Sequence, residues 1–149
     1  MRENNIHNLS LRVNEVFYNG GLNCAEATMQ LLINDGFVED SDTMQKMMTG
    51  FGGGMQRGLV CGAVVAAVAA ISANKGRKTA SESRELSATA VAEFLNSFET
   101  EFGALDCQAL TKSYESKSDE MYQNCSKIVA HAIELTESML TASKAKTPN

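Results

Sequence analysis

The chain has 149 residues, and 44% of them are hydrophobic, which suits one domain with a proper hydrophobic core. Its net charge of −5 and isoelectric point near 5.0 leave no basic footprint of clustered Lys and Arg. Binding to nucleic acid or docking on an anionic membrane surface is therefore not expected.

Apolar residues recur at helical spacing from the start of the chain, without strand alternation. A first stripe covers residues 9–17 and stops at Gly20-Gly21. A second helix is predicted to begin at Asn23, because Glu26 three residues later completes a capping-box pattern. The pair Asp35-Gly36 is a typical helix end, so this second helix is expected to stop there.

The segment 59–74 is apolar on every side, and a helix of that kind is buried on every side. It follows a glycine-rich loop, Gly50 to Gly58, and is predicted to be the central element of the fold. Leu86 opens the apolar stripe of a later helix, which Gly103 breaks. In addition to the helices described so far, further helices are expected over residues 41–49, 81–102, 107–110 and 119–143, of which 81–102 is the one that contains Leu86.

The sequence thus predicts an all-α fold, a single-domain bundle of about five to six helices around an Ala/Val-rich central helix. The domain is expected to span residues 1–149, with frayed ends at 1–7 and 144–149. No apolar segment typical of a signal peptide opens the chain. The longest apolar stretch, 59–73, is shorter than the roughly 20 residues of a membrane span. We therefore expect a cytoplasmic protein without membrane insertion.

Four cysteines, Cys24, Cys61, Cys107 and Cys125, are spread along the chain, and all but Cys61 directly follow Asn or Asp. Asn and Asp are preferred helix N-caps, so several thiols are expected in first helical turns. The helix dipole there favours a thiolate, the form that attacks disulfides and binds metals. In a reducing cytosol, cysteines of this kind indicate redox or metal chemistry more than structural bridges.

The spacing of the cysteines leaves their chemistry open. They are 37, 46 and 18 positions apart, so no CxxC pair brings two sulfurs together and the fold must do so. Three disulfide pairings are formally allowed. Zinc and iron–sulfur sites usually draw ligands from short runs, which makes them the less favoured alternative. Cys125 lies on an apolar stripe and also fits a small buried hydrophobe.

The glycine loop lacks the Lys-Ser/Thr of a phosphate-binding loop and the glycine spacing of a dinucleotide fingerprint. Its glycines permit left-handed backbone, and their N–H groups are able to form an anion-binding nest. Arg57 would add a positive charge near Cys61. The alternative is a flexible connector between helices. The candidate residues for anion or substrate binding are Gly52, Gly53, Gly54, Arg57 and Gly62.

Several blocks resemble the family of redox-active proteins named after the cysteine pattern C-GCAxxG-C-C. The matching blocks are Phe17 to Ala27, Gly52 to Met55, Cys61 to Ala66, Phe102 to Leu110, and Cys125 with the Ile-Val-Ala run that follows it. The resemblance spans roughly residues 9–140, and one position departs from the pattern, since Ala66 replaces the last glycine of the box. It implies a redox-active protein with all four cysteines at its site, and an association with a transporter.

Three hypotheses follow. In the first, the four thiols converge as a thiol/disulfide centre that needs no cofactor, with Cys61 as the most acidic thiol, Cys24 next, and Cys107 and Cys125 resolving. This would make the protein a thiol-disulfide oxidoreductase with an unidentified redox partner. In the second, the same four cysteines bind zinc or an iron–sulfur cluster. In the third, the chain is a helical adaptor for a transporter. The sequence leaves oligomerisation open.

Overall fold

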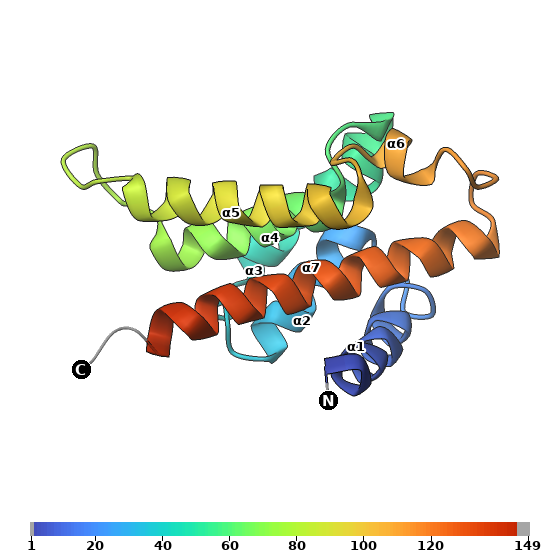
Figure 1. Cartoon of the computed structure of the whole chain (residues 1–149), viewed down its shortest axis with the longest axis horizontal. Helices are drawn as coiled ribbons and strands as arrows, with labels where there is room; N and C mark the ends of the chain where they lie inside the picture. Colours follow the sequence, from blue (N-terminus) through green and yellow to red (C-terminus); the bar gives the residue numbers. More distant parts are fainter. Residues whose placement is uncertain (1, 146–149) are drawn as a thin grey trace.

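The computed structural model describes the backbone of residues 2–145 and the side chains of residues 8–141. Within this part the fold is all-α, as predicted, with seven α-helices and two short helical turns, and no named strand. Figure 1 shows them as one bundle. The elements are α1 (Arg2–Val16), α2 (Cys24–Asn34), α3 (Asp42–Met47), η1 (Met48–Phe51), η2 (Gly54–Gly58), α4 (Gly62–Lys75), α5 (Glu85–Phe102), α6 (Cys107–Thr111) and α7 (Asp119–Ala145).

Helix α4 is the central element, as the sequence predicted. It packs against α2, α5 and α7, and Figure 1 shows α5 lying along it while the long α7 crosses the bundle. Its small side chains allow these close approaches, since Ala63, Ala66 and Ala67 are fully buried. The core around it is completed by large apolar side chains from α2, α5 and α7, among them Met29, Leu32, Phe94, Phe98 and Ile133.

The start of α2 is held by the predicted capping box. The Glu26 N–H donates to Asn23 Oδ1 at 2.9 Å, and the Asn23 N–H donates to Glu26 Oε1 at 3.0 Å. The Asn23 Nδ2 also donates to the Thr49 carbonyl at 3.0 Å, which ties α2 to η1. Because Cys24 is the first residue of α2, this network fixes the position of its thiol.

Two helices start later than predicted. Helix α4 begins at Gly62 instead of 59, because residues 59–61 pair with the segment before α6. Helix α5 begins at Glu85 instead of 81. Leu86 lies in the first turn of α5 and is 70% exposed, although the sequence placed it on the buried stripe.

Fraying was predicted for residues 1–7 and 144–149, and the structure describes only some of these residues. Residue 1 and residues 146–149 lie outside the described part of the chain, and the described backbone of residues 2–7 and 144–145 is helical. Among the described residues, no helix combines the length and apolar character needed to cross a bilayer.

Three helices are joined on the surface by a charged cluster, Arg12 of α1, Asp35 after α2 and Glu137 of α7. Arg12 Nη2 lies 2.6 Å from Asp35 Oδ1, and Nη1 donates to Oδ2 at 3.2 Å. Half-burial and the neighbouring Asp35 carboxyl raise the pKa of Glu137 to about 8. The cluster therefore makes stability depend on pH.

Stability is expected to fall as the pH rises from about 4.5 to about 8, because the Glu137 carboxyl loses its proton at a lower pH in the unfolded chain than in the folded protein. The Glu137→Gln variant should remove this decline and be more stable at pH 8.5 by about 1 kcal/mol, a value reduced for solvent screening. Urea denaturation at pH 5.5 and 8.5 measures it, with Glu93→Gln on the exposed face of α5 as control. An unchanged pH dependence in Glu137→Gln would contradict the assignment.

Candidate functional site

The structure brings the four cysteines together around one small cavity, although 101 positions separate the first from the last. All four are free thiols. The cavity has a volume of about 20 Å³, room for about one water molecule. The rest of its lining is mainly apolar and comes from α6 and α7, namely Leu110, Thr111, Ile128 and Val129.

Cys24 reaches the cavity because α2 and α4 approach closely at a glycine. A Cβ atom on Gly62 would lie only 2.6 Å from Cys24 Sγ and 2.9 Å from the Phe51 carbonyl oxygen. Any side chain at position 62 would therefore collide with the thiol. The glycine directly after Cys61 is what lets the first turn of α4 sit against the first turn of α2.

Cys61 and Cys107 are brought together by a short antiparallel bridge between Val60 and Asp106. The Cys61 N–H donates to the Leu105 carbonyl at 2.8 Å, and the Cys107 N–H donates to the Leu59 carbonyl at 2.7 Å. Successive residues in such a pair face opposite sides, so both cysteines lie on the side away from Val60 and Asp106. This pairing joins the start of α4 to the start of α6.

The glycine loop wraps against α6, as Figure 1 shows. A Cβ on Gly54 would lie 2.9 Å from Cys107 Cβ, and one on Gly58 would lie 2.9 Å from Gln108 Cβ. The left-handed backbone predicted for the glycines is confirmed, with φ of 63° at Gly53, 62° at Gly54 and 72° at Gly58. These glycines shape the loop that backs Cys107.

The left-handed conformation also extends to two residues that are not glycine. Met55 has φ 58° and Gln56 has φ 61°, so a complete left-handed turn runs over residues 53–56. For Met55 and Gln56, which have a Cβ atom, this conformation costs about 1–2 kcal/mol per residue relative to the right-handed one. The hydrogen bond from the Leu59 N–H to the Gly54 carbonyl, at 3.0 Å, closes the turn. Strained backbone of this kind is concentrated at functional sites in proteins.

Cys125 enters from the interior of α7, so only two of the three Asx-Cys pairs mark a helix start. Helix α7 begins at Asp119, and Asn124 is therefore an interior residue. Its Nδ2 donates to the Leu110 carbonyl at 3.3 Å and ties α7 to α6. Cys24 and Cys107, in contrast, are the first residues of α2 and α6, as predicted.

The prediction that Cys61 is the most acidic thiol is wrong. It is the N-cap of α4, but only 7% of it is exposed, and burial raises the pKa of Cys61 to about 12. The N–H groups of Val64 and Ala63 lower this pKa by less than burial raises it. Burial also raises the pKa of Cys125 to about 12, and it raises that of Cys107.

Cys24 is close enough to act electrostatically on each of the other three thiols. Burial is the main cause of the raised pKa of Cys61, Cys107 and Cys125, and the charge of Cys24 is in each case the next. A thiolate at Cys24 would therefore keep the other three protonated. Cys24 itself is partly exposed and is the first residue of the capped helix α2.

Of the five residues predicted to bind an anion, three are packed near the cysteines and two are exposed. Gly54 and Gly62 pack against Cys107 and Cys24, and a Cβ on Gly52 would lie 2.5 Å from Asn23 Cγ. Gly53 and Arg57 are exposed, and Arg57 is not among the residues that line the cavity. Three of the five thus shape the packing around the thiols, and anion binding at this loop stays a prediction.

Sequence reasoning missed Thr111, whose hydroxyl donates to the Cys107 carbonyl at 2.8 Å and which lines the cavity. Its side chain also lowers the pKa of Cys107, against the larger effect of burial. Its place four residues after Cys107, on the same face of α6, is a signal that would have found it. Within the described part of the chain, no group of three or more Cys, His, Asp or Glu side chains is arranged to hold a metal ion.

These features define an all-helical protein with a cluster of four free thiols at the meeting point of α2, α4, α6 and α7. Residues 22–139 match the family model described as "Putative redox-active protein (C_GCAxxG_C_C)". The match covers most of the chain and includes all four cysteines, so the protein belongs to this family. The comparison with curated proteins and the comparison with solved structures gave no match.

Proposed function

We propose that the protein is a thiol-disulfide oxidoreductase whose four cysteines form one reversible dithiol/disulfide centre. The observation that carries this proposal is that all four free thiols line one cavity, where Cys24 acts electrostatically on the other three. Disulfide formation requires sulfurs in close proximity, which the spacing along the chain alone would not supply. We propose the cytoplasm as its location, because reducing thiol systems operate there.

Cys24 is the proposed attacking residue. Its thiolate attacks one sulfur of a disulfide substrate, the substrate S–S bond breaks, and the other half leaves as a thiolate that takes up a proton. Cys107 then loses its proton and attacks the Cys24 sulfur in the mixed disulfide. The second half of the substrate leaves, and a Cys24–Cys107 disulfide remains. Two electrons have passed from the two protein thiols to the substrate.

The assignment of roles follows from the position of each cysteine and the pKa of its thiol. Cys24 and Cys107 are partly exposed first residues of helices, whereas Cys61 is buried and Cys125, although also partly exposed, is an interior residue of α7. A thiol with a pKa of about 12 is ionised in about one molecule in 10⁵ at neutral pH. Cys61 and Cys125 therefore serve as a second pair that reacts only after the first pair is oxidised.

The test is disulfide mapping by mass spectrometry after equilibration in buffers of reduced and oxidised dithiothreitol. Folded protein should lose two thiols reversibly, with Cys24–Cys107 as the first disulfide. Protein unfolded in urea is the control, because its thiols should give a mixture of the three possible pairings. Four thiols that stay free until the protein unfolds, or the same mixture in folded and unfolded protein, would refute the proposal.

The zinc or iron–sulfur alternative uses the same four thiols as ligands. The cavity supports it in bringing four sulfurs together, but these side chains would have to move to complete a metal site. Elemental analysis of protein purified without oxygen distinguishes the two functions. Near-stoichiometric zinc or iron that protects the thiols from dithiothreitol-dependent oxidation would favour the metal function.

A further inference from the structure

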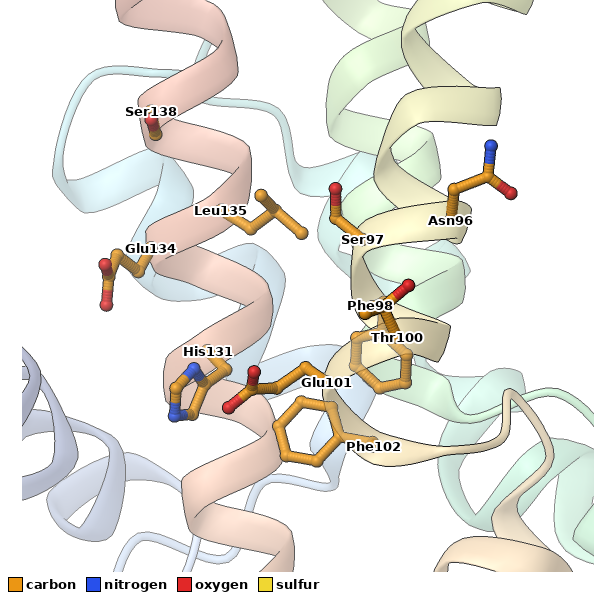
Figure 2. Close-up of a pocket in the computed structure, with 10 residues that line it drawn as sticks. All are labelled: Asn96, Ser97, Phe98, Thr100, Glu101, Phe102, His131, Glu134, Leu135 and Ser138. Carbon is orange, nitrogen blue, oxygen red and sulfur yellow. The ribbon is translucent and has the colours of Figure 1, made fainter.

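A second and much larger cavity lies between α5 and α7, away from the four cysteines. Its volume is about 680 Å³, within the range of about 300–1,000 Å³ typical of small-molecule sites. Figure 2 shows the side chains that surround it. Those that carry the argument are Ser97, Phe98, Glu101, Phe102, His131 and Leu135.

One wall of this cavity is aromatic. The Phe98 and Phe102 rings have centroids 4.8 Å apart, and Phe98 is almost fully buried. The His131 ring meets Phe102 edge-on with centroids 5.3 Å apart, which joins α7 to α5 at one end of the cavity. Phe102 is only partly buried, so part of its ring remains available to a ligand.

The charge of the cavity is negative. Its lining contains no Lys or Arg, and Figure 2 shows the Glu101 carboxylate directed from α5 toward α7, where His131 is located. Glu134 also lines the cavity, but in Figure 2 its carboxylate points away from α5. Among the side chains that the structure describes, none forms a hydrogen bond or ion pair with Glu101.

We infer that this cavity binds a small organic cation, an ammonium group attached to an apolar body. The ammonium would pair with Glu101 and contact the face of Phe102, an arrangement that combines a charged hydrogen bond with a cation–π contact. Phe98 and Leu135 would receive the apolar body, and Ser97 adds a hydrogen-bonding group. An anion would meet no Lys or Arg side chain in this lining. The site uses none of the four cysteines, so it is independent of the proposed function.

The test compares three ligands of nearly equal shape, 2-phenylethylammonium, 2-phenylethanol and phenylacetate, by amide chemical shifts in two-dimensional NMR. The ammonium should shift amides over residues 96–102 and 131–138 in a saturable way. Its dissociation constant should be about fivefold or more below that of the alcohol, and phenylacetate should bind most weakly. Equal binding of ammonium and alcohol, or no saturable shift with any of them, would overturn the inference.

Variants test which residue recognises the charge. Glu101→Gln should weaken binding of 2-phenylethylammonium by about fivefold or more and leave binding of 2-phenylethanol unchanged. Glu93→Gln lies on α5 outside the cavity and is the matched control, which should bind like the native protein. Since both glutamates are exposed, neither substitution should affect folding. Unchanged ammonium binding in Glu101→Gln, or equal losses in both variants, would refute the role of Glu101.

Discussion

The Cys24→Ser variant is expected to lower the rate of disulfide exchange by about a hundredfold, because it removes the proposed attacking sulfur and burial raises the pKa of each of the other three thiols. After burial, the electrostatic effect of Cys24 is the second cause of the raised pKa of Cys107, and this substitution removes it. The pKa of Cys107 should therefore fall, and its alkylation by iodoacetamide at pH 8 should become faster. Loss of exchange together with faster Cys107 alkylation is the pattern expected if Cys24 is the attacking residue and also acts electrostatically on Cys107.

The measurement pairs a dithiothreitol-coupled reduction of a small disulfide with residue-resolved alkylation by mass spectrometry. Cys125→Ser is the matched control, because it also removes one thiol of the cavity but not the proposed attacking group; it should keep most of the exchange rate. Slow alkylation of buried Cys61 in each variant shows that the fold is retained. Native exchange rates in Cys24→Ser would rule out the proposed role of Cys24.

The Gly62→Ala variant is expected to lose about 1–2 kcal/mol of stability, although alanine is the better helix former. The added Cβ would lie 2.6 Å from Cys24 Sγ and 2.9 Å from the Phe51 carbonyl oxygen, closer than atoms approach without a shift. Both neighbours are fixed, Cys24 by the capped start of α2 and Phe51 by the backbone of η1. Either α2 and α4 must move apart or the Cys24 thiol must leave its position.

Urea denaturation gives the change in stability, and the alkylation rate of Cys24 reports whether its thiol has moved. Gly50→Ala is the control, since a Cβ there meets nothing within 4 Å and its φ is not in the left-handed region. It should leave both readings near the native values. A Gly62→Ala protein as stable as the native one, with native Cys24 reactivity, would show that this contact does not position the thiol.

The Gly62 contact gives a physical meaning to the cysteine-glycine-alanine box that names the family. Cys61 caps α4, Gly62 leaves room for the Cys24 sulfur, and Ala63 is fully buried in the helix interface. The box departs from the family pattern at Ala66, which replaces glycine. Ala66 is also fully buried, so this position accommodates a methyl group within the packed interface.

Much of the fold could be predicted from local patterns. The capping box at Asn23 and Glu26 placed the start of α2 correctly, and the uniformly apolar run after the glycine loop identified the central helix. Signals of this kind depend on residues a few positions apart, and they were reliable for that reason. They failed at Leu86, which continues the apolar stripe but is 70% exposed in the first turn of α5, because packing between helices is not encoded by local spacing.

The acidity of the thiols shows the limit of local reasoning most clearly. A helix N-terminus lowers the pKa of a cysteine, and on that ground Cys61 was expected to be the most acidic. Burial acts in the opposite direction and is stronger, so the pKa of Cys61 rises to about 12. Burial depends on residues that are distant in sequence, such as Ile128 and Val129, which line the same cavity.

The sequence alone determined the family, the helical class and the four cysteines to which we assign the proposed chemistry, because motifs, apolar periodicity and capping patterns are properties of the chain itself. Only the tertiary structure decided that these residues meet. Two backbone hydrogen bonds between residues 59–61 and 105–107, together with the absence of a side chain at Gly62, bring the sulfurs to one cavity. Contacts between segments that are dozens of residues apart produce no periodic pattern in the sequence. Only the folded structure therefore shows which thiols are neighbours.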